Sequence, residues 1–109
     1  MMKPEIIGMI GPKSDESVSK GREVHVIGGG IDPDYIAAFS KAHEDSGFDK
    51  VLVGYSSSSA DGFLIALHAA ANTTKLGYLI AHRPGFVSPT VLARKVATLD
   101  HLTKGRIAL

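Results

Sequence analysis

The chain has 109 residues, 44% of them hydrophobic, with 12 Lys and Arg against 11 Asp and Glu and no cysteine. A chain of this length builds one small domain, and its near-zero net charge argues against a general nucleic-acid-binding protein. No apolar run approaches the roughly 18 residues of a membrane span. Without cysteine there is no disulfide and no cysteine–zinc site, and with no secretory signal at the start we expect a cytoplasmic protein.

Charge is distributed unevenly along the chain. Residues up to Thr74 carry six basic and ten acidic side chains, and the remaining residues carry six basic side chains against Asp100 alone. Such stretches usually form solvated helix faces whose charges pair within the fold. The composition therefore predicts no acidic or basic partner by itself.

The first predicted strand is the apolar run at residues 6–10, whose length and β-branched content favour a strand buried on both faces. Residues 11–31 follow as a polar, glycine-rich loop, and loops of this length are often functional. Asp32 has the chemistry of a helix N-cap, and Pro33 suits the first helical position. A helix is therefore expected from Pro33 to the stop at Gly47.

A second strand is predicted at residues 51–53. Ser58 with Asp61 three residues later resembles a capping box, which predicts a second helix over residues 60–71. Asn72 is suited to a left-handed cap at the end of that helix.

The third strand is expected at residues 76–81. Ser88 as N-cap and Pro89 at the first helical position open a third helix, which Gly105 ends. Residues 106–109 begin a fourth strand, and the sequence stops within it.

The resulting order, βαβαβαβ, requires parallel strands joined by right-handed crossovers, in an open doubly wound sheet or in a barrel. Four strands and three helices in 109 residues have the density of half a (β/α)8 barrel, which typically needs ~250 residues. We therefore predict an α/β fold, the first half of a TIM barrel. Residues 1–109 are expected to be the N-terminal part of a single barrel domain.

Common catalytic motifs are absent. Pro33 stands where a dinucleotide fingerprint following residues 28–30 needs its third glycine. A serine takes the second glycine position of a nucleophile elbow at residues 54–58. No two of the five histidines are three or four residues apart, so a helical metal site is disfavoured.

Residues 81–89 are the most informative segment, because they join a strand to a helix N-terminus. In both parallel architectures this turn lies at the carboxyl face of the sheet, where ligands bind. His82, Arg83 and Phe86 bring an imidazole, a guanidinium and an aromatic ring there. Structural roles remain open: Arg83 could pair with a carboxylate, His82 with backbone carbonyls, and Phe86 could cover the core.

The same region resembles the third strand and third helix of the bacterial luciferase-like flavin monooxygenases, nearest the alkanesulfonate monooxygenase branch. The matching residues are Arg83-Pro84, Ser88-Pro89-Thr90-Val91, Ala93-Arg94, Ala97-Thr98-Leu99-Asp100 and Gly105-Arg106. Upstream, the likeness continues through Gly47-Phe48, Val51-Leu52, Asp61 and Phe63-Leu64.

This resemblance implies a barrel that receives reduced FMN from a separate flavin reductase and uses O2 to oxidise a small organic substrate, such as an alkanesulfonate. Cofactor contacts are then expected at Ser56, Ile80, Ala81 and His82, where members of the family sometimes have a cis peptide bond. Substrate contacts are expected at Ser59 and Arg83.

Two positions depart from the alkanesulfonate branch. Ser59 stands near a cysteine of that branch, and His82 replaces an apolar residue. The family's principal catalytic histidine and arginine and its flavin-phosphate loops come later than Leu109, so we assign no catalytic residue. A flavin that reacts with oxygen needs an enclosed site, and we expect this chain alone to be inactive.

Ala66, Ala69 and Ala70 form a small-residue face on the second predicted helix. The resemblance implies that members dimerise through this helix and the next, although the alanines could instead pack on the chain's own sheet. Two other functions stay open: a flavin- or deazaflavin-dependent dehydrogenase that does not use oxygen, and a non-catalytic α/β fragment that acts by dimerising.

Overall fold

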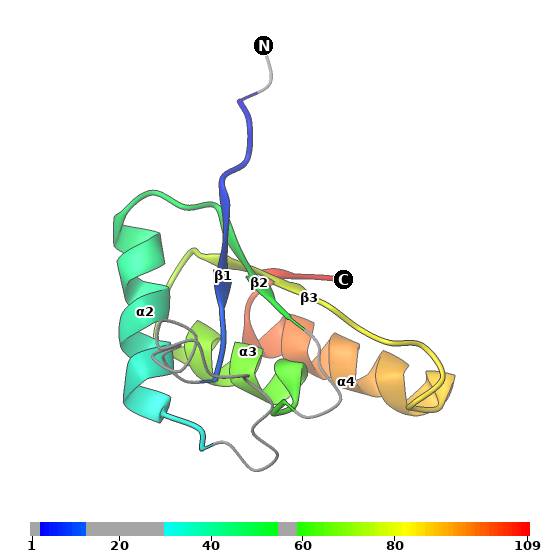
Figure 1. The fold of residues 1–109 in the computed structure, drawn as a ribbon. Coiled ribbons are helices and arrows are strands. Elements are labelled where there is room, and N and C mark those ends of the chain that lie inside the picture. The colour runs from blue at the N-terminus through cyan, green and yellow to red at the C-terminus, as the bar shows by residue number, and fades with distance from the viewer. Residues whose placement is uncertain (1–2, 13–29, 55–58) are drawn as a thin grey trace.

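The computed structural model describes residues 3–12, 30–54 and 59–109. Parallel strands alternate with helices along the chain (Figure 1). The elements are β1 (Ile7–Ile10), α2 (Pro33–Asp45), β2 (Lys50–Val53), α3 (Gly62–Ala71), β3 (Gly77–Ile80), α4 (Pro89–Leu102) and β4 (Ile107–Ala108).

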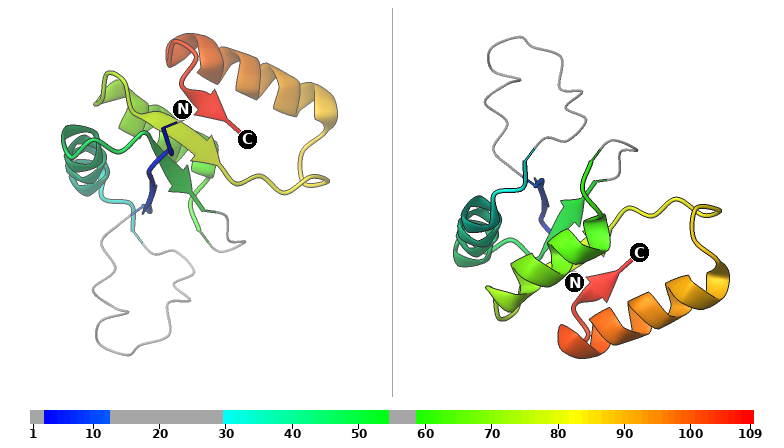
Figure 2. Two further views of the ribbon diagram at one scale, coloured as in Figure 1. Left: turned by 90° about the horizontal axis from the view of Figure 1, so that it is seen from above. Right: turned by 90° about the horizontal axis from the view of Figure 1, so that it is seen from below.

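The four strands form one parallel sheet in the order β1-β2-β3-β4. A doubly wound sheet reverses its strand order, whereas sequential right-handed crossovers place successive helices on the same face. Figure 2 shows the helices following one another around the sheet. The open doubly wound alternative is therefore wrong, and the arrangement is that of the first half of a (β/α)8 barrel.

The predicted beginnings of α2 and α4 are confirmed. Asp32 Oδ1 accepts a hydrogen bond from the N–H of Tyr35 at 3.0 Å, and Ser88 Oγ accepts one from the N–H of Val91 at 3.4 Å. Each helix has proline in its first turn, where a missing N–H costs nothing. The chain leaves the two helices through Gly47 and Gly105, with φ of 87° and 79°.

The expected ends of α3 need correction. Asp61 itself is the N-cap, its Oδ2 accepting the N–H of Leu64 at 2.9 Å, so the helix begins at Gly62 rather than at residue 60. Ser58 lies outside the described residues. Asn72 has a φ of −105°, so the expected left-handed cap does not form. Its side-chain nitrogen instead donates to the carbonyl of His68 at 2.8 Å, which satisfies an otherwise free helix-end acceptor.

The core lies between the sheet and the helices. Alternate strand residues face the helices, among them Val51 and Val53 of β2 and Tyr78 and Ile80 of β3, all at most 3% exposed. The prediction that the first strand is buried on both faces is wrong. Its Met9 is 60% exposed, because the described helices cover only one face of the sheet.

A buried carboxylate links α2 to the start of β3. Glu44 accepts hydrogen bonds from the N–H groups of Thr74, Lys75 and Leu76 at 2.9, 2.8 and 2.9 Å. Burial by itself raises the pKa of Glu44, but these three donors and the Lys41 ammonium outweigh it and lower the pKa to about 2. Ionised Glu44 therefore closes the turn before β3.

A guanidinium makes the corresponding link at the start of β4. Arg106 donates to the carbonyl oxygens of Ala70 at 2.9 Å, Leu76 at 3.1 Å and Thr103 at 2.9 Å, and to Thr73 Oγ1 at 3.1 Å. Its planar group thus satisfies carbonyls from the end of α3, the start of β3 and the end of α4. This link and the Glu44 link both lie at the amino ends of the strands.

Gly8 on β1 leaves room for the ring of His43. A Cβ at this position would lie 2.5 Å from the ring atoms Cδ2 and Nε2 of His43. The ring cannot move aside easily, because Phe39 and Phe48 pack edge-on against it and its Nδ1 lies 2.8 Å from the carbonyl of Phe39.

We therefore expect Gly8→Ala to lower the free energy of unfolding by about 2 kcal/mol, the usual cost of forcing a group into a packed core. Urea denaturation followed by circular dichroism measures this loss. Gly54→Ala is the matched control, since a Cβ there meets nothing within 4 Å in the part of the chain that the structure describes. Equal stabilities of the two variants would contradict the packing argument.

No helix in the described ranges is long and apolar enough to cross a membrane. Within the same ranges, no three His, Asp or Glu side chains gather as a metal-binding group.

Candidate functional site

A cavity of about 260 Å³ opens at the carboxyl ends of β2 and β3. The start of α3, the β3–α4 loop and the first two turns of α4 enclose it, so two βα units contribute to one site. Its lining residues are Gly54, Ser59, Ala60, Asp61, Gly62, Phe63, Ala81, His82, Arg83, Phe86, Val87, Leu92 and Lys95.

The strand pairing carries the β3–α4 loop into this cavity. The N–H of Ala81 donates to the carbonyl of Val53 at 2.9 Å, which extends the β2–β3 pairing one residue past β3. The imidazole ring of His82, the residue after Ala81, packs against the ring of Phe63, with centroids 6.0 Å apart and an angle of 62° between the ring planes. Arg83 lies over the exposed Phe86, its Cζ 5.5 Å from the ring centroid. Backbone pairing and aromatic packing therefore fix the orientation of the loop.

Two charged residues, Lys95 and Asp61, complete the cavity wall, and the sequence pattern did not identify them as site residues. Lys95 Nζ lies 5.1 Å from the ring centroid of Phe63 and 3.8 Å from Asp61 Oδ1. Lys95 follows Leu92 by three residues and precedes Leu99 by four, so it interrupts the apolar stripe of α4. A lysine within an apolar stripe was the sequence signal that could have identified it.

The structure brings together four of the six predicted site residues. Ser59, Ala81, His82 and Arg83 all line the cavity. Ile80 does not, because its side chain is 1% exposed and points to α3, where a Cβ on Gly62 would lie 3.5 Å from it. Ser56 lies outside the described residues.

Backbone geometry at the end of β3 is ordinary. Among the described residues every peptide bond is trans, including those around Ile80 and His82. The cis bond that the family resemblance raises for this position is therefore not present here.

The cavity combines apolar walls with hydrogen-bonding and cationic groups. Phe63, Val87 and Leu92 supply apolar surface, while His82 and Arg83 supply donors. This is the usual composition of a small-molecule site, in which a few polar groups orient a mainly apolar ligand.

The lining fits one edge of a flat cofactor ring. Gly54 has no side chain and Ala81 has only a methyl group, both at the ends of neighbouring strands, and a Cβ on Gly54 would meet no described residue within 4 Å. A planar ring could lie against this backbone without displacing a large side chain.

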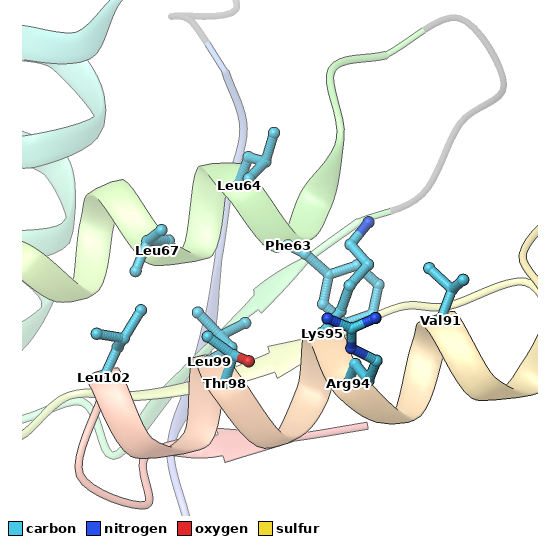
Figure 3. A pocket seen from close by; sticks show the side chains of 9 residues that line it. All are labelled: Phe63, Leu64, Leu67, Val91, Arg94, Lys95, Thr98, Leu99 and Leu102. Atoms are coloured by element: carbon cyan, nitrogen blue, oxygen red, sulfur yellow. The ribbon is translucent and has the colours of Figure 1, made fainter.

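A second hollow, of about 340 Å³, separates α3 from α4 on the outer side of the fold (Figure 3). Leu67 of α3 and Leu102 of α4 point toward one another across it. Leu64 and Leu102 are each 62% exposed. The groove is lined by Phe63, Leu64, Leu67, Val91, Arg94, Lys95, Thr98, Leu99 and Leu102.

The alanine face of α3 does not contribute to this outer surface. Ala66, Ala69 and Ala70 are at most 3% exposed and belong to the core. The interpretation of these alanines as a face for another helix is therefore wrong, and they pack within the chain. The exposed side of α3 is instead formed by larger side chains such as Leu64.

Comparison with known proteins decides the family. The sequence model of the luciferase-like monooxygenases matches residues 11–109, which is nearly the whole chain. The chain belongs to this family. The match does not establish the alkanesulfonate branch within this family.

Two solved structures are similar to the chain. A long-chain alkane monooxygenase superposes with a TM-score of 0.73 at 20% identity, covering 99% of this chain and 30% of that one. A riboflavin lyase, solved with modified FMN and its substrate riboflavin, gives a TM-score of 0.63 at 29% identity over 70% of this chain and 22% of that one. The chain thus spans less than a third of either protein and shares the fold of that part.

Proposed function

We propose that this chain forms the first part of a luciferase-like monooxygenase domain that uses reduced FMN and O2 to oxidise a small organic compound. The observation that carries the proposal is the family match over residues 11–109. The riboflavin lyase, which was solved with modified FMN, supports a flavin as the cofactor. The substrate class includes alkanesulfonates, as the sequence resemblance implies, and a separate cytoplasmic reductase would supply the reduced flavin.

Within this proposal, each residue at the cavity has a role that follows from its position. The backbone from Ile80 to His82, and also Ser56, would hold one edge of the flavin ring, and the flavin would supply the oxygen-activating chemistry. Ser59 and Arg83 contact the substrate, and the guanidinium of Arg83 favours a substrate with a negatively charged group. Phe63 and Val87 exclude water from that side of the cavity.

The described residues supply only part of such a site. In this barrel class the phosphate-binding loops usually follow strands seven and eight, and the described chain supplies four strands. We therefore expect residues 1–109 alone to show no oxygenase turnover.

We also propose that the full protein dimerises through the groove between α3 and α4. Leu64, Leu67 and Leu102 present a mainly apolar surface there that a helix of a second copy can cover. This contact lies on the outside of the barrel arc, away from the cavity at the strand ends.

The functional proposal can be tested in a chimera in which residues 1–109 replace the matching segment of the long-chain alkane monooxygenase. We expect reduced FMN to bind and substrate oxidation to consume O2. His82→Ala and Arg83→Ala should each lower kcat/KM at least about tenfold, equivalent to about 1.4 kcal/mol of transition-state stabilisation. Lys104→Ala, at the opposite end of the strands, is the control and should retain full activity.

Oxygen measurements separate the alternatives. A chimera that melts cooperatively yet binds no flavin would contradict the proposal. Substrate oxidation without oxygen uptake would favour a dehydrogenase of the flavin or deazaflavin type.

A further inference from the structure

Lys95 extends its side chain from α4 across the ring of Phe63 toward the start of α3 (Figure 3). Its Nζ lies 5.1 Å from the ring centroid, and Phe63 itself is only 9% exposed. A cation over an aromatic face is attracted by the negative charge density of the ring. The ring therefore holds the ammonium group at the wall of the candidate-site cavity, which Lys95 lines.

The ammonium of Lys95 has an ionic partner but no hydrogen-bond acceptor among the described residues. Asp61 Oδ1 lies 3.8 Å from Nζ, which is too long for a hydrogen bond. Asp61 cannot close this gap freely, because its Oδ2 accepts the N–H of Leu64 at 2.9 Å and so begins α3. The N–H donors of the ammonium are therefore available to an anionic atom of a ligand in the cavity.

The charges that line the cavity do not cancel. Lys95 and Arg83 are positive, and Asp61 is negative. With a neutral His82, one net positive charge remains among the lining residues that the structure describes. Cationic groups beside apolar wall residues such as Leu92 favour a ligand with an acidic head and an apolar body, while the carboxylate of Asp61 repels additional negative charge.

We propose that Lys95 and Asp61 together make this cavity selective for a ligand with a single negative charge and an apolar body. The acidic head accepts hydrogen bonds from Lys95, and the apolar body lies against Phe63 and Leu92. Lys95 supplies an attraction that a neutral ligand cannot use, whereas Asp61 disfavours a dianion at the same place. The inference rests on the proposed function only in that this ligand is the substrate to be oxidised.

Three probes with similar alkyl chains test this selectivity. At about pH 8.5, hexanoate carries one negative charge, hexanamide carries none and hexyl phosphate carries about two. Residues 1–109 are titrated with each probe. Binding is followed by nuclear magnetic resonance, from the chemical shifts of the backbone amides of Gly62 and Ala81, two residues that line the cavity.

We expect the parent chain to bind hexanoate about tenfold more tightly than hexanamide, as hydrogen bonds to a charged group would give. Lys95→Met should remove most of this preference by weakening the binding of hexanoate alone, and Lys95→Arg should keep it. Arg94→Met is the matched control, since Arg94 is the neighbouring cation on α4 and lines the outer groove, not the cavity. Equal binding of hexanoate by the Lys95→Met and Arg94→Met variants would overturn the proposal.

Asp61→Asn tests the selectivity in the opposite direction. Asparagine caps a helix about as well as aspartate does, so α3 should still begin at Gly62 while one negative charge is lost. The binding of hexyl phosphate should tighten about tenfold, and the binding of hexanamide should not change. Circular dichroism melts establish that the variant folds. Unchanged or weaker binding of hexyl phosphate by the folded variant would overturn the proposal.

These titrations need neither flavin nor oxygen, so failure of the charge selection can be distinguished from failure of the proposed oxygenase function. A chain that discriminates among the probes, with a chimera that binds no flavin, would contradict the oxygenase function alone. A chimera that binds FMN and oxidises neutral compounds as readily as anionic ones would overturn the charge selection alone. Failure of the parent chain to bind hexanoate at millimolar concentration would overturn it too.

Discussion

Replacing Glu44 with alanine will lower the free energy of unfolding by about 3 kcal/mol. The substitution leaves the N–H groups of Thr74, Lys75 and Leu76 without their acceptor, and loss of bonds to a charged group costs about 1.5–3 kcal/mol each before solvent replaces part of them. Glu44→Gln keeps one acceptor oxygen and should lose about half as much. Urea titration at pH 7 measures both, with Asp45→Asn as a control because Asp45 forms only an exposed pair with Lys41.

Glu44 also makes the free energy of unfolding depend on pH. Its pKa is about 2 in the folded protein against an ordinary value of 4.5. A lowered folded-state pKa stabilises the fold above pH 4.5, and this contribution disappears as pH falls from 4.5 towards 2. Glu44→Gln should remove the contribution at every pH, so the difference in stability between parent and variant narrows through this window. A constant difference from pH 7 to pH 2 would contradict the assignment.

Arg106→Met will have an effect of similar size, about 3 kcal/mol. It leaves the carbonyls of Ala70, Leu76 and Thr103 without a donor at the point where two helices and two strands meet. Arg106→Lys should recover little, because one ammonium cannot reproduce the planar fork that reaches all three oxygens.

Thermal and urea unfolding measure the loss at Arg106. The control is Arg94→Met, since Arg94 is exposed on α4 and substitutions of this kind usually change stability by less than about 0.5 kcal/mol. If Arg94→Met and Arg106→Met proved equally stable, the bonding role of Arg106 would be refuted.

The sequence predicted the order of elements because local signals agreed with the tertiary fold. Asp32-Pro33 and Ser88-Pro89 combine an N-cap with a favoured first residue, and both helices begin there. The ends of α3 were less predictable. Ser58 and Asp61 are both suitable N-cap residues at its start. At its end, Asn72 can either adopt the left-handed backbone conformation or donate a side-chain hydrogen bond to a helix carbonyl. Which one is used depends on contacts with the rest of the fold.

Burial and long-range pairs were harder to foresee. The composition of residues 6–10 is that of a fully buried strand, but composition does not say whether a neighbour covers the second face. Glu44 and Arg106 join segments about 30 residues apart, and no local pattern marks such a pair. Within the candidate site, the β3–α4 loop could be predicted because it follows a strand. Lys95 could not be predicted in this way, because it reaches the cavity only through the packing of α4 on α3.

Glu44 and Arg106 hold the amino ends of the strands, while the loop from Ala81 to Ser88 occupies the opposite end. Substitutions in that loop can therefore change the cavity without disturbing the bonds that keep the helices on the sheet. Related sequences should therefore vary more at residues 85–87 of that loop than at these two anchors.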